Sequence, residues 1–230
     1  DNAVEETKPI NVASVPQRSL FRYPGGKTWL VPTVRKWLRS FNNSKGIFVE
    51  PFLGGGIISL TVAFENLSQQ VIACELDEEI AAVWHVLLSK DSEKLAQRIL
   101  QFEMNLDNLK EALNTPPKGM LDKAFQTILK NRTYHGGILA KGSGILKNGE
   151  NGKGINSRWY PTTLARRIRD INEIKSKITF KEADAFALIR EHVDNERAIF
   201  FIDPPYSVST KKAGNRLYTH FELDHKYLFS

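Results

Sequence analysis

The chain contains an abrupt junction where the apolar residues 198–202 are followed by Asp203-Pro204-Pro205-Tyr206. Five consecutive apolar residues predict a buried strand, and the two prolines predict its end, because proline lacks the N–H group that a central strand uses. In open α/β sheets, ligands bind at the carboxyl ends of the strands. The junction therefore predicts either a ligand site with a carboxylate, a rigid carbonyl and an aromatic ring, or a plain strand end with an Asp cap.

A second predicted strand ends at Glu50 and is followed by a turn that contains Gly54-Gly55-Gly56. A helical stretch and another strand come next, and that strand ends at Glu75. Glycines let a backbone approach a ligand closely, and an acid at about this separation can accept hydrogen bonds from ribose hydroxyls. The combination favours a nucleoside-containing cofactor over a plain turn. It also predicts an α/β fold with a doubly wound, Rossmann-like sheet.

The net charge of +6 is concentrated in one part of the chain. From Lys130 to Arg169 there are nine basic residues and one acid, Glu150. Residues 136–154 also hold seven of the 15 glycines, and a long loop of this kind is usually functional or disordered. Concentrated positive charge indicates a polyanionic partner, the alternative being a merely solvated basic face.

These patterns predict three regions. Residues 1–20 form a loosely held N-terminal tail without the apolar core of a signal peptide. Residues 21–85 and 170–230 form the sheet domain, and residues 86–169 form a mostly helical insertion with the basic, glycine-rich loop. No apolar stretch approaches the 18 residues or so that would span a membrane. Cys74 is the only cysteine, which predicts no internal disulfide and no cysteine-based zinc site.

Three motifs in this order resemble the Dam-like, alpha-group DNA adenine-specific methyltransferases. They are Phe21-Arg22-Tyr23-Pro24-Gly25-Gly26-Lys27, Glu50-Pro51-Phe52-Leu53-Gly54-Gly55-Gly56 and Asp203-Pro204-Pro205-Tyr206. Asn131-Arg132 followed by Gly136-Gly137 is similar to the recognition-region signature of that family. The resemblance implies an S-adenosylmethionine-dependent methyltransferase with a target-recognition insertion between its cofactor and catalytic motifs. It also implies a cytoplasmic enzyme of bacterial or phage origin.

The resemblance implies S-adenosyl-L-methionine as the cofactor. The implied contacts are Tyr23, Lys27, Glu50, Phe52, Gly54, Gly56, Glu75, Asp184, Phe186 and Asp203. Tyr23 stands where the family often has Trp. Phe186 would contact the adenine of the cofactor or belong to the core, since apolar residues at helical spacing usually do.

Asp203, Pro204 and Tyr206 are the predicted catalytic residues. The exocyclic amine of adenine is a poor nucleophile, because its lone pair is delocalised into the ring. The Asp203 carboxylate and the Pro204 carbonyl would accept its two N–H bonds and localise that lone pair, and charge-assisted bonds of this kind are strong. The base must be flipped out of the duplex, and Tyr206 would stack on it.

The predicted partner is double-stranded DNA. Basic residues would contact phosphates, and two arginines, Arg132 and Arg158, could pair with guanine edges. The predicted DNA-binding residues are Lys130, Arg132, Lys141, Lys147, Lys153 and Arg158.

Three alternatives remain open at this stage. Only 24 residues follow Tyr206, so the C-terminal strands of the sheet are expected to be missing, and a truncated or catalytically impaired DNA- and cofactor-binding module is possible. Cytosine exocyclic-amine methylation follows the same chemistry. Protein-glutamine methylation is disfavoured, because those enzymes usually carry Asn where Asp203 stands. The recognition sequence, the biological setting and the oligomeric state are not readable from the sequence.

Overall fold

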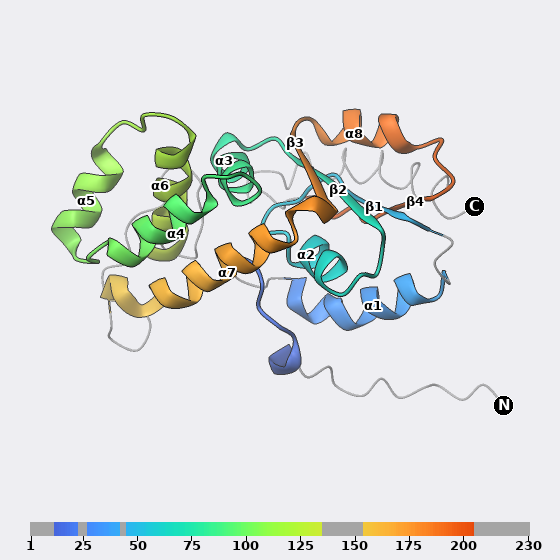
Figure 1. Ribbon diagram of the computed structural model, residues 1–230, viewed down its shortest axis with the longest axis horizontal. Coiled ribbons are helices and arrows are strands. Elements are labelled where there is room, and N and C mark those ends of the chain that lie inside the picture. The colour runs from blue at the N-terminus through green and yellow to red at the C-terminus, as the bar shows by residue number, and fades with distance from the viewer. Residues whose placement is uncertain (1–11, 23–26, 42–44, 135–153, 205–230) are drawn as a thin grey trace, which may run out of the picture.

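The computed structural model describes residues 12–22, 27–41, 45–134 and 154–204 (Figure 1). The strands are β1 (Ile47–Glu50), β2 (Gln70–Glu75), β3 (Ile178–Glu182) and β4 (Ala198–Phe200). The α-helices are α1 (Val31–Arg39), α2 (Ile57–Phe64), α3 (Glu78–Leu87), α4 (Ser92–Gln101), α5 (Leu106–Asn114), α6 (Met120–Thr133), α7 (Pro161–Glu173) and α8 (Ala185–His192). Short 3-10 helices include η2 (Lys27–Leu30) and η5 (Gly154–Arg158). None of these helices is long and apolar enough to cross a membrane.

The described strands form one parallel sheet in the order β3-β2-β1-β4. The chain leaves β1 towards β2 on one side and reaches β4 on the other, so the order reverses between β1 and β4. In such sheets the crevice at the reversal, outside the carboxyl ends of the strands, is where ligands bind. The predicted α/β class with a parallel sheet is confirmed.

Both faces of the sheet are covered by helices, with α8 on one face and α1 and α2 on the other (Figure 1). Neighbouring residues of β1 accordingly enter different clusters. Phe48 belongs to the large core, while Val49 packs with Leu188 of α8 and with Cys74 and Ala198. Both β1 side chains are 0% exposed, as expected for a central strand of a parallel sheet.

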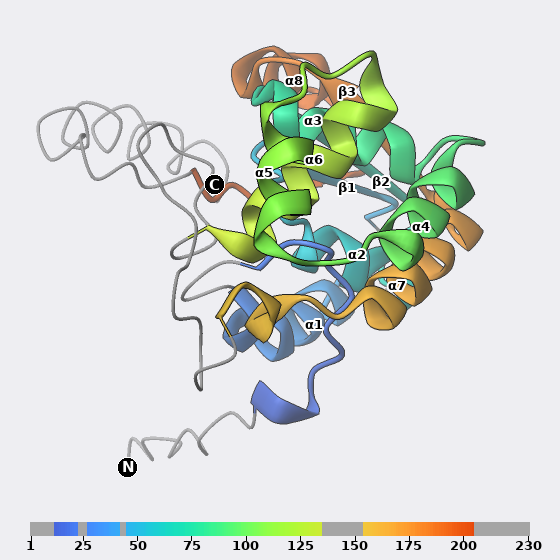
Figure 2. The same ribbon diagram turned by 90° about the vertical axis from the view of Figure 1, so that its left-hand side faces the viewer.

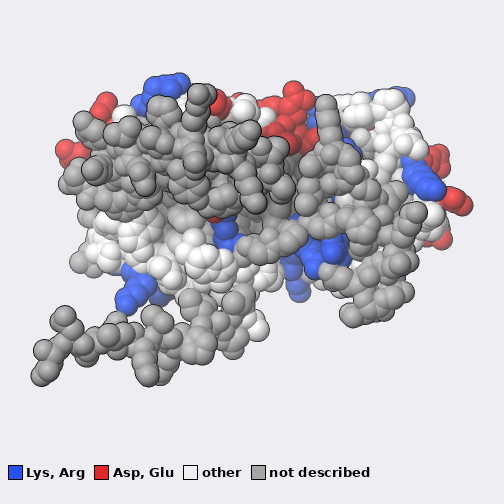
Figure 3. Space-filling model, turned by 180° about the vertical axis from the view of Figure 1, so that it is seen from behind, with Lys and Arg blue, Asp and Glu red and all other residues white. Residues whose placement is uncertain are grey.

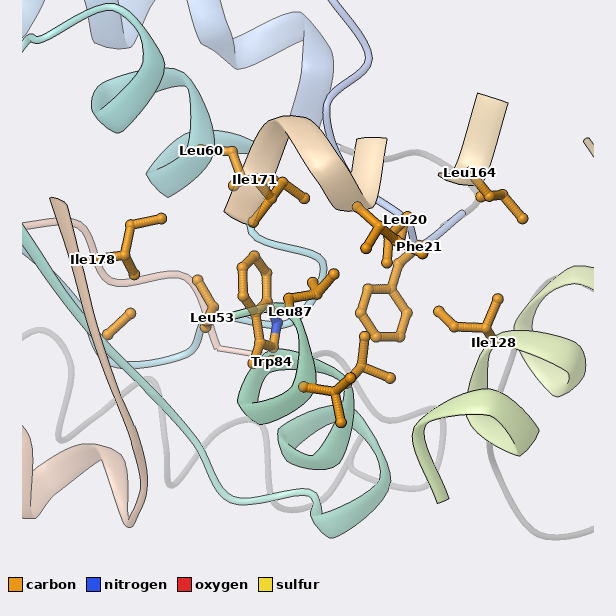
Figure 4. Close-up of a cluster of buried hydrophobic side chains, with 14 of the residues drawn as sticks. Leu20, Phe21, Leu53, Leu60, Trp84, Leu87, Ile128, Leu164, Ile171 and Ile178 are labelled. Atoms are coloured by element: carbon orange, nitrogen blue, oxygen red, sulfur yellow. The ribbon is translucent and has the colours of Figure 1, made fainter. Parts of the chain in front are cut away.

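The helical part of the chain shares its core with the sheet. Trp84 of α3 lies at the centre of the large cluster, with Leu53 beside it and α7 residues such as Ile171 above it (Figure 4). Helix α3 contacts β2 and β3 as well as α6, and α7 contacts both α3 and α4. The predicted limits of the insertion, 86 and 169, therefore fall within α3 and α7, which are continuous with the main core (Figures 1 and 2).

Candidate active site at the carboxyl edge of the sheet

Lys27 and Asp203 meet at the carboxyl edge of the sheet. The Lys27 Nζ atom lies 2.9 Å from Asp203 Oδ2, and both side chains are about a third exposed. Pairing with β1 continues past the end of β4, because the Phe201 N–H donates to the Val49 carbonyl at 2.9 Å. This bond holds the chain beside β1 shortly before Asp203. The predicted strand end therefore presents a carboxylate next to the end of the central strand.

Glu50, at the end of β1, is buried and only 1% exposed. Its Oε2 atom accepts hydrogen bonds from the Ser59 hydroxyl and from the Ser59 backbone N–H, in the first turn of α2. Burial raises the pKa of Glu50 to about 7, and the negative charge of Asp203 adds to this rise. Lys27 and the Ser59 bonds act in the opposite direction. The site thus holds a carboxyl group that changes its charge near neutral pH.

The glycine turn after β1 depends on left-handed backbone at two positions. Gly54 has φ of 53° and Gly56 has φ of 70°, and Gly56 is the residue before the first turn of α2. A Cβ on Gly56 would lie 2.4 Å from the Trp84 ring, whereas a Cβ on Gly54 would meet nothing within 4 Å. The Trp84 indole N–H donates to the Gly54 carbonyl at 2.8 Å. Trp84 therefore packs against the turn at Gly56 and binds the Gly54 carbonyl, while the space beside the Gly54 Cα is open.

Glu75 ends β2 on the other side of this turn. Its carboxylate accepts hydrogen bonds from the backbone N–H groups of Gly54 and Leu76. Burial, followed by the nearby charge of Asp77, raises the pKa of Glu75 to about 7, and Lys27 partly offsets the rise. Asp77 itself caps α3 through the Glu79 and Ile80 N–H groups. Leu76 is 65% exposed beside this carboxylate.

Asp184 and Phe186 begin α8, after β3. Asp184 is the helix cap and accepts from the N–H groups of Phe186 and Ala187. The Ala183 N–H donates to the Glu75 carbonyl, which joins this corner to the end of β2. Phe186 is 41% exposed, so the alternative prediction of a core position does not hold for its side chain.

Five of the predicted cofactor-site residues thus lie at one edge of the sheet. They are Glu50 on β1, Glu75 on β2, Asp184 at the start of α8, Asp203 after β4 and Lys27 on η2. Phe52 is half-buried in the glycine turn between them. The predicted residues Tyr23, Lys141, Lys147, Lys153 and Tyr206 lie outside the described part of the chain.

The basic residues at the end of α6 have protein partners. Lys130 Nζ lies 2.7 Å from Glu79 Oε1, and Arg132 Nη2 donates to the Leu20 carbonyl at 2.6 Å. Arg132 is only 5% exposed, and burial lowers its pKa to about 10. Arg158 is 8% exposed. These two side chains are buried, which argues against the predicted contacts with base edges.

Sequence reasoning missed several residues that build the site. Ser59 holds Glu50, Trp84 ties the glycine turn, and Leu76 offers an exposed apolar surface next to Glu75. Only Leu76 carried a local signal, since it directly follows a predicted strand-end acid. The other two reach the site from helices.

A cavity of about 280 Å³ lies away from this edge. It is lined by residues of the 16–18 segment, by Phe64 at the end of α2, and by Arg166, Arg167 and Asp170 of α7. It contains none of the predicted site residues. In the described residues, no group of three His, Cys, Asp or Glu side chains could hold a metal ion.

The chain has an open parallel sheet with acids at the ends of β1 and β2 and after β4, next to a glycine turn. In α/β proteins with such a sheet, ligands bind at the point where the strand order reverses. Residues 23–229 match the family model of the D12 class N6 adenine-specific DNA methyltransferases, and the chain belongs to that family. The family resemblance and the adenine-specific DNA methylation predicted from the sequence are thereby confirmed.

A similar curated protein is the type II methyltransferase M.MjaIII of Methanocaldococcus jannaschii. It is 21% identical over 226 residues, which cover 90% of this chain and 75% of that protein.

Proposed function

We propose that this adenine-specific DNA methyltransferase binds S-adenosyl-L-methionine across the ends of β1 and β2 and receives the target adenine at the end of β4. The cofactor supplies a methyl group on a sulfonium, which is an electrophile. The observation that carries the proposal is the Lys27–Asp203 pair, which lies next to Glu50 at the point where the strand order reverses.

The residues at this edge fit such a cofactor. Gly54 leaves open space on one side of the turn. Glu75 has lone pairs beyond those used by Gly54 and Leu76, so it can accept from two ribose hydroxyls. Leu76 and Phe186 are exposed apolar side chains near this carboxylate and suit the two faces of an adenine ring. Glu50, when ionised, suits the amino group of the methionine part.

Asp203 and the Pro204 carbonyl then hold the target base. Both accept hydrogen bonds from the exocyclic amine, which localises the lone pair on its nitrogen. The bound cofactor would supply the methyl group to that nitrogen, and the Asp203 carboxylate would accept the proton that the methylated nitrogen loses. Alignment of the two reactants supplies a large part of the rate in such a transfer.

Double-stranded DNA would lie against the edge of the sheet that carries Asp203. In the view from behind, Lys and Arg side chains lie at several places on the described surface, including its centre (Figure 3). We retain residues 86–169 as the proposed recognition part, with phosphate contacts from Lys141, Lys147 and Lys153 and stacking by Tyr206. Lys130, Arg132 and Arg158 would act there chiefly by anchoring α6 and η5. Similarity to a type II methyltransferase supports a restriction–modification role.

The proposal is tested by incubating the full chain with tritiated S-adenosylmethionine and a random-sequence DNA pool, followed by modified-base sequencing. Asp203→Ala should reduce methyl transfer by at least about 10²–10³-fold, the range found when a group that stabilises a transition state is removed. Asp194→Ala is the matched control, because Asp194 is exposed in the loop before β4 at the opposite end of the strand. Near-normal transfer by Asp203→Ala would refute the assignment.

A further inference from the structure

The 19–22 segment runs through the interior between the glycine turn and the helices α6 and α7. Leu20 and Phe21 are 1% and 7% exposed, and both point into the central core near Ile128 of α6 (Figure 4). The Ser19 hydroxyl donates to the Gly55 carbonyl at 2.5 Å. This segment therefore joins the glycine turn to the helical part of the chain, and Lys27 follows it five residues later in the sequence.

Asn131 binds both backbone groups of one residue in this segment. Its Oδ1 atom accepts from the Arg22 N–H at 2.8 Å, and its Nδ2 atom donates to the Arg22 carbonyl at 3.0 Å. The side chain is 0% exposed. A primary amide can reproduce the donor and acceptor of a peptide group, so Asn131 holds Arg22 as a neighbouring strand would.

Two arginines from the same helices hold the residues just before Arg22. Arg132 donates to the Leu20 carbonyl at 2.6 Å and Arg167 donates to the Ser19 carbonyl at 2.9 Å. Three carbonyls of the 19–22 segment thus end on side chains of α6 and α7. Arg22, which Asn131 binds, is the residue of the segment nearest in sequence to Lys27. Among the three side chains, Asn131 alone binds both a donor and an acceptor of the segment.

We propose that Asn131 is a positioning residue for methyl transfer: it holds Arg22 so that Lys27 reaches Asp203 and Glu50. Helix α6, whose last turn begins the basic stretch from Lys130 to Arg169, would thereby determine where the proposed cofactor-site residue Lys27 lies. This inference rests on the proposed function, because it requires Lys27 to belong to the cofactor site. A purely structural Asn131 would contribute to stability and to nothing else.

The matched control is Gln126, another amide on α6. Its Nε2 atom donates to the carbonyls of Ala112 and Thr115, so it ties α6 to α5 and has no bond to the 19–22 segment. Asn131→Ala and Gln126→Ala each remove an amide that makes two bonds to backbone groups. The affinity for S-adenosylmethionine, measured by calorimetry, and the KM values for cofactor and DNA then separate positioning from stability.

Asn131→Ala should raise the Kd and the KM for S-adenosylmethionine about tenfold, as expected when two hydrogen bonds that order a binding segment are lost. Its KM for DNA should change by less than about threefold, because the proposed phosphate contacts come from Lys141, Lys147 and Lys153 and not from Asn131. Gln126→Ala should leave the cofactor affinity unchanged at a similar loss in Tm. Equal effects of the two variants on cofactor affinity, or wild-type affinity in Asn131→Ala, would overturn the inference.

Asn131→Ser gives a second measurement if Asn131→Ala does not fold. Its hydroxyl keeps a polar group at the buried position but is too short to bind both backbone groups of Arg22, so we expect a loss of cofactor affinity no larger than in Asn131→Ala. Wild-type affinity in a folded Asn131→Ser would count against the positioning role. The wild-type chain distinguishes the two proposals: if it binds no S-adenosylmethionine, the proposed function itself fails. If the wild-type chain binds the cofactor and methylates DNA, and the Asn131 variants bind the cofactor as tightly as the wild type, the positioning role alone fails.

Discussion

The Lys27 ammonium group lies 2.9 Å from the Asp203 carboxylate, at the carboxyl edge of the sheet. Its charge also lowers the pKa values of Glu50 and Glu75 against the larger effect of burial. One lysine before α1 thus acts on the ends of β1 and β2 and on the chain after β4. Removing it should affect all three positions together.

Lys27→Met should therefore reduce cofactor affinity and destabilise the fold by about 1 kcal/mol at pH 8, because an ion pair that is about a third exposed contributes little more. The loss should be smaller at pH 5, where Glu50 and Glu75 are largely protonated. Lys94→Met is the control, since Lys94 pairs with Asp91 at 2.8 Å at the start of α4, a helix that packs on α6 and α7. Urea unfolding at the two pH values measures the difference, and equal losses in both variants would contradict the prediction.

Glu50→Gln should make the protein more stable at pH 8 than the wild type. The folded-state pKa of Glu50 is raised to about 7, so the folded protein binds the proton more tightly than the unfolded chain does, and stability falls as pH rises from about 4.5 to 7. The full effect above pH 7 corresponds to about 3 kcal/mol. It should vanish below about pH 4.5.

Thermal unfolding across this pH range measures the Glu50→Gln effect. The same variant should bind S-adenosylmethionine more weakly, because it cannot become ionised, and such a trade-off between stability and activity is common at functional sites. A pH-independent difference in stability would show that burial of this carboxyl is not its cause.

Gly56→Ala should destabilise the protein by about 2–4 kcal/mol, since left-handed backbone and overpacking add together there. The new Cβ would lie 2.4 Å from the Trp84 ring. Gly54→Ala meets open space and should cost only about 1 kcal/mol, the strain of positive φ alone. Urea unfolding compares the two, and similar losses would contradict the packing argument.

Phe186→Ala should weaken S-adenosylmethionine binding about tenfold, because stacking on a base contributes about 1–3 kcal/mol. Its effect on stability should be small, since the ring is 41% exposed. Val193→Ala serves as the control, because Val193 is a 54% exposed apolar residue at the other end of α8. Calorimetric titration with the cofactor measures both, and an unchanged Kd in Phe186→Ala would remove Phe186 from the site.

Much of the sheet edge was predictable from local patterns. The strand that ends at Glu75, the glycine turn and the stop after residues 198–202 appear where the sequence predicts them, although β4 is shorter than the apolar run. The sequence predicts contacts with base edges for Arg132 and Arg158, but both side chains are buried. Charge in a sequence does not reveal burial. The partners of these two arginines are backbone carbonyls, including that of Leu20, which leave no mark on the sequence.

The sequence by itself determined where acids follow strands and where the backbone can turn, because strand ends, prolines and glycines act on their immediate neighbours. Membership of the methyltransferase family was also readable from motifs in order. Only the tertiary structure decided that Lys27 meets Asp203 and that Asn131 holds Arg22. Those pairs come from distant parts of the chain, and they depend on the strand order and on the packing of α6 against the 19–22 segment.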